Sequence, residues 1–350
     1  MKVDEISRDG EEARLRVQVL PEEMDKAFSV GLDTFVAQYE LQDASGETSI
    51  EKIKNTLDED AAKNAINFAV VNYLLSFALS ERGIVPLASY DFAWSTDPQA
   101  GETFMFEMTA LLNPHYELSD YGRLTVQVDA KPEVQDEDIE EQMRMLVRQF
   151  TAWEQGADIN SPELTVPDVS DAWVEERMGS NGVHTVDDLR EKFRETSEQE
   201  LAERYEQAKM AAAMDEYMVR VQGEPTEKML DAMTSELFEA FLAELAQDGL
   251  TFEEFSVQQG MSEDDVRDTL AIQAKNQLMQ GFVLDAIFEH EALELTPPDL
   301  QVALRNAAPG QEEDYLESLQ KYGRTELLKQ AAKRMKAASW IMENTTFITN

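Results

Sequence analysis

The feature of the sequence that most constrains the fold is one amphipathic helix followed by a short connection. Residues 133–154 carry acids and Arg between apolar residues that recur every three or four positions, as in a helix with one buried face. These apolar residues are Ile139, Met143, Leu146, Phe150 and Trp153. Asp136 or Asp138 can cap the start of the helix. Only residues 155–172, with two prolines, separate it from a further run of helical patterns, and so short a connection cannot form a separate domain.

The first part of the chain, residues 1–112, is expected to form an α+β domain. Short segments in it alternate apolar and polar residues, which is typical of strands with one buried face. Two longer stretches carry apolar residues at helical spacing, and Gly83 followed by Pro86 ends the second. The expected strands are 13–20, 90–94 and 103–112, and the expected helices are about 22–38 and 60–82.

The rest of the chain divides into a linker, residues 113–172, and an almost entirely helical domain, residues 173–350. The linker contains an alternating segment, 124–130, before its one long helix. In the helical domain an acid follows a Ser or Thr by three residues where several apolar stripes begin, which is typical of helix starts. These positions are Thr185, Thr251, Ser262 and Thr296. Residues 224–247 and 266–290 are expected to form an antiparallel pair, and residues 315–342 one long helix.

Acidic residues far outnumber basic ones in this chain. Its 71 Asp and Glu against 30 Lys and Arg give a formal net charge of −41. A surface of this charge repels phosphates, so neither direct binding to nucleic acid nor binding to an anionic membrane is expected. One basic cluster lies near the C-terminus, where pairing with acids elsewhere in the chain is expected. It contains Lys321, Arg324, Lys329, Lys333, Arg334 and Lys336.

The sequence contains few residues of the types that usually form catalytic or metal-binding sites. The chain has no cysteine, which excludes disulfides and thiolate catalysis. It has no apolar run of about 18 residues and no apolar N-terminal signal, so a cytoplasmic protein without a membrane span is expected. His115, His184 and His290 lie far apart in the sequence and show no metal-binding spacing. No catalytic residue, metal or cofactor is therefore expected.

Several segments, in their order and spacing, resemble trigger factor, a family of ribosome-associated bacterial chaperones. Residues 185–194, TVDDLREKFR, resemble the family's entry into its C-terminal domain. Residues 224–233, EPTEKMLDAM, and 249–255, GLTFEEF, resemble its first C-terminal arm. Residues 19–21, VLP, followed by DKA resemble the N-terminal strand-to-helix entry. In the family, a helix like that at 133–154 leads into an FKBP-like prolyl isomerase domain. The chain therefore resembles a trigger factor from which that domain is missing.

The resemblance implies an elongated molecule in which an α+β N-terminal domain is joined to a mostly α-helical C-terminal domain with two helical arms. It implies an ATP-independent chaperone, or holdase, that binds exposed apolar segments of unfolded or nascent proteins and needs no cofactor. Catalysis is not expected, because the isomerase domain is missing. Two other functions stay open, namely a protein dedicated to binding or assembling one partner, and a peptidyl-prolyl isomerase, which is the family's usual label. A homodimer also stays open.

One loop departs from the family. Trigger factors carry a Gly-Phe-Arg-x-Gly-Lys-x-Pro loop between their first two N-terminal helices, and this loop docks on the ribosome. The corresponding residues here, 39–50, contain no Arg or Lys and carry acids at Glu40, Asp43 and Glu47. Contacts with RNA depend on cationic side chains, so ribosome docking through this loop is not expected.

Candidate client-binding residues lie on the apolar stripes of the expected first arm. The stripes are wider than two packed helices need, and methionine side chains adapt to varied partners. Each of these residues can instead belong to the core between the helices. The candidates are Met229, Met233, Phe238, Phe241, Met279 and Phe282.

Overall fold

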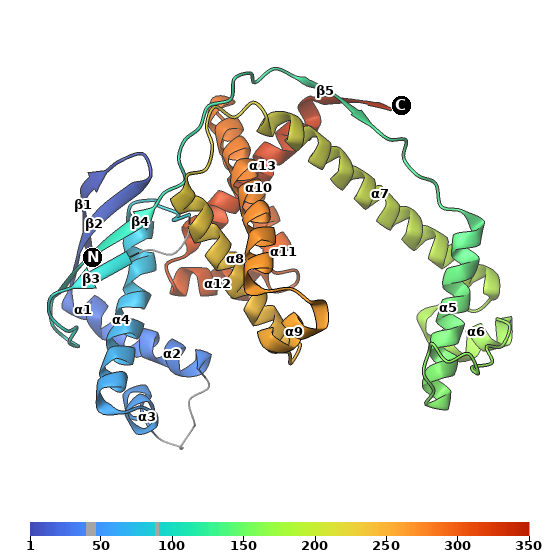
Figure 1. Cartoon of the computed structure of the whole chain (residues 1–350), viewed down its shortest axis with the longest axis horizontal. Helices are drawn as coiled ribbons and strands as arrows, with labels where there is room; N and C mark the ends of the chain where they lie inside the picture. The colour runs from blue at the N-terminus through green and yellow to red at the C-terminus, as the bar shows by residue number, and fades with distance from the viewer. Residues whose placement is uncertain (40–46, 88–90, 350) are drawn as a thin grey trace. The chain divides into compact units, whose positions relative to one another are not determined.

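The computed structural model describes residues 1–39, 47–87 and 91–349, and contacts group the chain into two compact units (Figure 1). The first unit contains Met1–Gly122 and Tyr217–Trp340, and the second contains Arg123–Glu216 and Ile341–Asn350. Each unit therefore combines two pieces of chain that are distant in the sequence. The units do not coincide with the predicted segments 1–112, 113–172 and 173–350, because contacts between distant elements define them.

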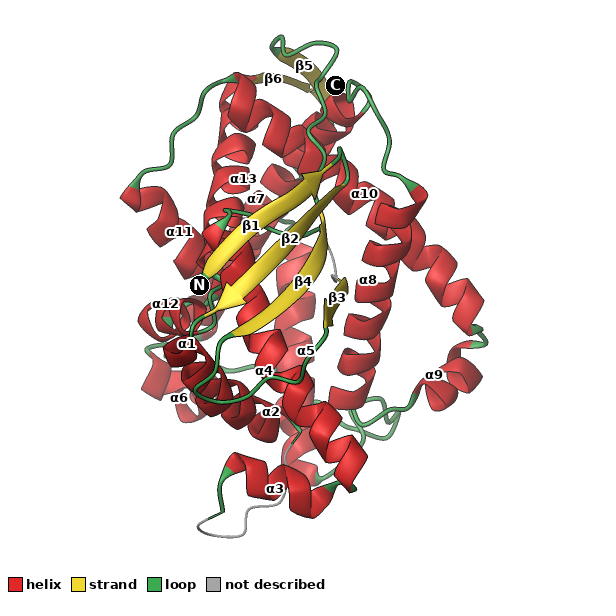
Figure 2. Cartoon of the chain, turned by 90° about the vertical axis from the view of Figure 1, so that its left-hand side faces the viewer, coloured by secondary structure: helices red, strands yellow, loops and turns green. Residues whose placement is uncertain are grey.

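The first unit contains a four-stranded antiparallel sheet in the order β1-β2-β4-β3 (Figure 2). Buried and exposed side chains alternate along β2 (Glu12–Val19), which confirms the predicted strand. β3 (Asp91–Trp94) and β4 (Phe104–Leu111) confirm the other two, although Tyr90 lies outside the described residues. β1 (Lys2–Arg8) was not predicted, because nearly all its side chains are exposed and its sequence lacks the alternation.

Helices pack on this sheet and share one core with it. α1 (Pro21–Lys26), a π-helical turn (Ala27–Gly31) and α2 (Leu32–Gln38) follow one another without a break, which confirms the predicted helix at 22–38. α4 (Glu59–Glu81) confirms the second predicted helix. It ends before Gly83, whose φ of +61° lies in the left-handed region that glycine adopts without strain.

The segment that corresponds to the ribosome-docking loop is described only at its ends. Glu40 and Asp43 lie outside the described residues. The segment ends where α3 (Ser49–Thr56) starts, with a capping box between Thr48 and Glu51. The sequence did not predict this helix.

Three helices of the first unit, α8 (Glu227–Gln247), α9 (Phe252–Gln259) and α10 (Glu263–His290), are together named the arm. α8 and α10 pack side by side, and the short α9 connects them. This confirms the predicted pair. The predicted start signals at Thr251 and Ser262 are also confirmed, since each forms a reciprocal capping box with the acid three residues later.

The C-terminal helices are α11 (Pro297–Ala307), α12 (Glu312–Lys321) and α13 (Thr325–Asn344). The prediction of one long helix at 315–342 is wrong, because the chain turns between Lys321 and Thr325. Gly323 has a φ of +65°, and a Cβ atom there would lie 2.8 Å from the Phe77 ring. The turn therefore packs closely on α4.

Ion pairs join α13 to its neighbours. Arg334 donates to both carboxylate oxygens of Asp285 on α10, at 3.0 and 2.7 Å. Lys336 donates to Asp299 on α11 at 2.8 Å, and this bond together with bonds from Thr296 lowers the pKa of Asp299 to about 2. The expected pairing of the basic C-terminal cluster with acids elsewhere is confirmed for these two residues.

In its described residues, the second unit contains a parallel strand pair, three α-helices and one 3-10 turn (Gly179–Asn181). β5 (Leu124–Val128) was predicted, but its partner β6 (Thr345–Thr349) was not. α5 (Asp136–Gln155), α6 (Asp171–Met178) and α7 (Val186–Met218) share a small core that contains Ile139, Met143, Val147, Trp173, Val174 and Leu189. No helix in the described part of the chain is long and apolar enough to cross a membrane.

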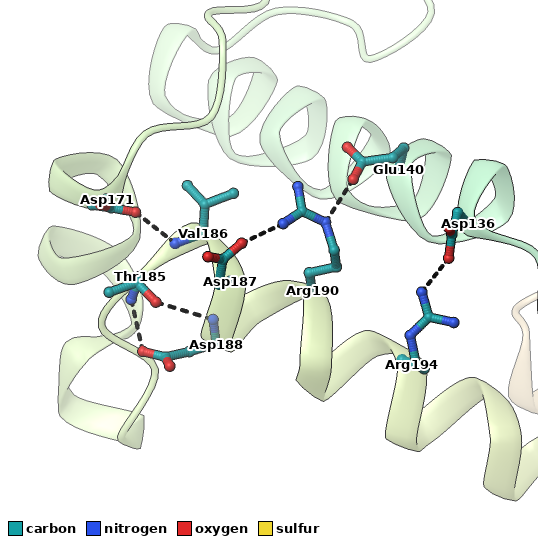
Figure 3. A network of polar contacts seen from close by, with 9 residues as sticks. All are labelled: Asp136, Glu140, Asp171, Thr185, Val186, Asp187, Asp188, Arg190 and Arg194. Carbon is teal, nitrogen blue, oxygen red and sulfur yellow. Dashed lines mark hydrogen bonds and ion pairs between the residues drawn. The ribbon is translucent and has the colours of Figure 1, made fainter.

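Polar contacts hold the helices of the second unit together (Figure 3). Arg190 on α7 donates to Glu140 on α5 at 2.7 Å, and Arg194 on α7 pairs with Asp136. Thr185 and Asp188 form the predicted box at the start of α7. Hydrogen bonds from the His184 backbone N–H and from Thr185 lower the pKa of the Asp188 carboxyl. The cap of α5 differs from the prediction, because Gln135 occupies that position and Asp136 already lies in the first turn.

The short connection after α5 lies against that helix. Arg148 donates to the carbonyl oxygens of Ile159 and Ser161 at 2.5 and 2.9 Å. Residues 157–170, all of which the structure describes, contain neither helix nor strand, in agreement with the predicted extended segment. Trp153, predicted on the apolar face of α5, is 80% exposed, so it is not part of the buried stripe.

Candidate functional site

The base of the arm is part of the core of the first unit. Met229 on α8 is fully buried and Phe282 on α10 is 1% exposed. Both pack in a cluster with Leu111 at the end of β4, and the Tyr116 ring meets the Phe282 ring edge-on at 4.7 Å between centroids. Two of the six candidate residues therefore hold the arm onto the sheet, and neither presents its side chain to solvent.

Four phenylalanines gather where α9 joins the arm. The centroid of Phe238 on α8 lies 5.8 Å from that of Phe252 on α9, and Phe241 lies 5.1 Å from Phe255. The guanidinium carbon of Arg267 on α10 lies 3.9 Å from the Phe238 ring centroid, a cation–π contact. Phe238 is 6% exposed, so this third candidate residue is also mainly structural.

The other three candidates, Met233, Phe241 and Met279, keep part of their side chains in solvent. Leu242, Val257 and Ile272 add further exposed apolar surface on the same three helices, and Ile272 is 68% exposed. Single exposed apolar residues are common on protein surfaces. Several of them on one helical hairpin, however, provide a surface that can bind an apolar partner. The residues called the arm surface below are Met233, Phe241, Leu242, Val257, Ile272 and Met279.

Phe252, Phe255 and Arg267 were missed by the sequence analysis. The signal for the two phenylalanines was present, since they lie three residues apart just after the capping box at Thr251. Their contact with α8 depends on how α9 folds back, which the sequence pattern does not show. The position of Arg267 over an aromatic ring likewise depends on the packing of α10 against α8.

Two acidic side chains of the arm, Glu254 on α9 and Asp265 on α10, lie in capping boxes at the starts of their helices. Hydrogen bonds from the Thr251 backbone and hydroxyl lower the pKa of the Glu254 carboxyl. The Ser262 hydroxyl and backbone do the same for Asp265. Both groups therefore stay charged at neutral pH. Their charges are part of the formal net charge of −41.

In the part of the chain that the structure describes, no group of three or more His, Asp and Glu side chains is arranged to hold a metal ion. His115 lies between two carboxylates, 3.1 Å from Glu117 and 2.9 Å from Glu289. The ring of His290 stacks on that of Tyr121, with centroids 3.6 Å apart. His115 and His290, which are distant in the sequence, thus both link residues 113–122 to the end of α10, a structural role.

Two curated relatives are similar to part of this chain. The trigger factor of Finegoldia magna is 27% identical over 194 residues, which cover 54% of this chain and 43% of the relative. The trigger factor of Agathobacter rectalis is 24% identical over 189 residues, which cover 53% and 42%. The chain thus spans less than half the length of the curated relatives it matches.

A solved structure concerned with promiscuous substrate recognition in folding and assembly activities of the trigger factor chaperone also matches. The match covers 98% of this chain and 99% of the other, with 12% identity and a TM-score of 0.38. A TM-score this low supports no comparison of the two arrangements.

Two family models match most of the sequence between them. The model described as bacterial trigger factor protein matches residues 1–146, and the model of the trigger factor C-terminus matches residues 185–343. The interval 147–184, which the structure describes in full, holds the end of α5, the short connection and α6, and contains no strand. The chain therefore belongs to the bacterial trigger factor family and lacks the family's middle domain.

Proposed function

We propose that this chain is an ATP-independent chaperone, a holdase, that binds exposed apolar segments of unfolded or nascent polypeptides on the arm surface. The observation that carries the proposal is the exposed apolar side chains on α8, α9 and α10, in a chain of this family. Clients would bury their apolar residues against Met, Phe, Leu and Ile side chains, and many weak contacts would allow release without a nucleotide. The strong negative charge would keep the complex in solution.

A substitution set on the arm surface tests this proposal. In the triple variant Met233→Gln, Phe241→Gln and Met279→Gln, we expect the concentration needed to suppress aggregation of a denatured client to rise about 10-fold. These side chains are partly in solvent, but Met233 and Met279 also pack against the cluster of Met229 and Phe282, and Phe241 packs on Phe255. We therefore expect each substitution to cost about 1–2 kcal/mol of stability. Aggregation is followed by light scattering, and stability by thermal unfolding.

The matched control is Met145→Gln. Met145 lies on α5 in the second unit and is 45% exposed. The control substitution therefore replaces an exposed methionine by glutamine at a position outside the arm. We expect the control to leave suppression of aggregation unchanged. If the triple variant suppresses aggregation as well as the parent chain, clients do not bind at these residues. If the parent chain suppresses no aggregation, a protein dedicated to one partner becomes the better proposal.

We propose that the chain does not catalyse prolyl isomerisation, although peptidyl-prolyl isomerase is the family's usual label. Lowering a rotation barrier of about 18–20 kcal/mol requires a shaped pocket around the prolyl bond. The interval 147–184 supplies no folded domain for one. A protease-coupled peptide assay is expected to show the uncatalysed rate, and an acceleration proportional to protein concentration would refute this proposal.

Three further expectations remain proposals. Ribosome docking through residues 39–50 is not expected. Salt-sensitive sedimentation of the protein with ribosomes that depends on the residues of this loop would contradict this, whereas sedimentation unchanged by substitutions in the loop would indicate another docking surface. A cytoplasmic location is expected and can be checked by cell fractionation. A homodimer stays open, and light scattering of the purified chain decides it.

A further inference from the structure

All the sulfur of this chain is in methionine, since its 350 residues contain 16 methionines and no cysteine. Oxidation of a methionine thioether to the sulfoxide is reversible, because dedicated reductases restore the thioether. Methionine is therefore the residue through which an oxidant can modify sulfur in these residues and a reductant can reverse the change.

Two methionines belong to the arm surface, and they lie on different helices. Met233 on α8 and Met279 on α10 both pack against the cluster that contains Met229 and Phe282. Each also keeps part of its side chain in solvent. Two segments that are distant in the sequence thus bring two partly exposed thioethers to one apolar cluster.

The third methionine of this cluster is protected from solvent. Met229 is fully buried, with 0% of its side chain and backbone surface exposed. A dissolved oxidant reaches partly exposed side chains more readily than fully buried ones. Oxidation can therefore change the arm surface while the core beneath it remains intact.

Conversion to the sulfoxide changes what the arm surface can bind. The thioether is flexible and apolar, so it adapts to varied apolar partners, whereas the sulfoxide is polar. An apolar client side chain that covered a sulfoxide would remove water from its oxygen and offer no hydrogen-bond donor in return. Burial of a polar group without a hydrogen bond is costly, so oxidation weakens binding at these positions.

We propose that Met233 and Met279 form an oxidant-sensitive modification site, at which hydrogen peroxide forms sulfoxides and lowers the affinity of the arm for clients. In each step one peroxide oxygen is transferred to the sulfur, which loses two electrons, and the other oxygen leaves as water. A methionine sulfoxide reductase with a dithiol reverses the step, giving the thioether, a disulfide and water. The inference rests on the proposed chaperone function, because it concerns the same surface.

The test uses the full chain treated with hydrogen peroxide, which catalase removes before a denatured client is added. Peptide mass spectrometry gives the sulfoxide fraction at each methionine, and thermal unfolding shows whether the oxidised chain remains folded. We expect oxidation of Met233 and Met279 to raise the concentration needed to suppress aggregation about 10-fold. Methionine sulfoxide reductase with dithiothreitol is expected to restore the original concentration.

A double variant, Met233→Leu with Met279→Leu, keeps apolar side chains at both positions but cannot be oxidised there. Compared with its own untreated sample, it is expected to change less than about 2-fold after peroxide. The matched control is Met105→Leu with Met145→Leu, which removes two methionines outside the arm that are 50% and 45% exposed. The control is expected to lose as much activity to peroxide as the parent chain.

The outcomes separate this inference from the proposed function. An untreated parent chain that suppresses no aggregation would refute the proposed function and this inference with it. An active parent chain that keeps its activity when both arm methionines are oxidised would overturn the inference alone. In a series of partial oxidations, a loss that follows the sulfoxide fraction at Met105 or Met145 would also overturn it. So would oxidation of the buried Met229 as fast as that of Met233 and Met279.

Discussion

Replacing Phe282 by Ala is expected to lower the free energy of unfolding by about 3–5 kcal/mol, although the sequence places Phe282 on an apolar stripe of an arm. The side chain is 1% exposed and packs with Leu111, Met229 and Leu278, with the Tyr116 ring edge-on against it. Its removal leaves a cavity where the arm meets the sheet, and the β4 backbone cannot easily move to fill it. Urea unfolding followed by circular dichroism measures the loss.

Ile272→Ala is the matched control, because Ile272 lies on the same helix and is 68% exposed. Its effect on stability is expected to stay within about 0.5 kcal/mol. In a client-aggregation assay at a temperature where both variants are folded, the Phe282 variant is expected to retain activity. If Phe282→Ala proves as mild as Ile272→Ala, Phe282 is not part of the core and returns as a candidate for client contact.

Replacing Gly323 by Ala is expected to cost about 2–4 kcal/mol. Two penalties add at this turn between α12 and α13. The φ of +65° is strained for any residue with a Cβ atom, and that atom would lie 2.8 Å from the Phe77 ring and 3.0 Å from the Phe77 backbone nitrogen. Because one of these neighbours is backbone of α4, the contact cannot be relieved by a change of side-chain rotamer alone.

Gly310→Ala separates the two penalties. Gly310 has a similar φ of +76°, but an added Cβ atom would meet nothing within 4 Å. It is therefore expected to cost only the backbone strain, about 1–2 kcal/mol. Urea unfolding of the two variants in parallel gives the difference. Equal losses would mean that the turn can move away from α4, and that its close packing contributes little to stability.

Local patterns predicted most helices and strands correctly, because their causes are local. The alternation along β2 and the apolar spacing of α4 are properties of consecutive residues, and Gly83 ends α4 through its own backbone freedom. The break at Gly323 was missed because the residues on both sides fit one helical stripe. β1 was missed because nearly all its side chains are exposed, and β6 because it becomes a strand by pairing with the distant β5.

The candidate site was predicted only in part, because the burial of a side chain depends on packing between segments and not on the local sequence. A stripe of Met and Phe shows that a helix face is apolar, but not what covers it. Met229 and Phe282 turned out to lie under the end of β4, and Phe238 under α9 and Arg267, whereas Met233, Phe241 and Met279 remain partly in solvent. Leu111 lies more than a hundred positions from Met229 and Phe282, and the coverage of Phe238 depends on how α9 and α10 fold back on α8.

The sequence by itself determined the family resemblance, the helical pair of the arm, the short connection after α5 and the strongly acidic charge, since each depends on residue order and composition alone. The tertiary structure decided which apolar residues are core and how the two units combine distant pieces of chain. Burial arises when distant segments pack together, and no local pattern carries that information.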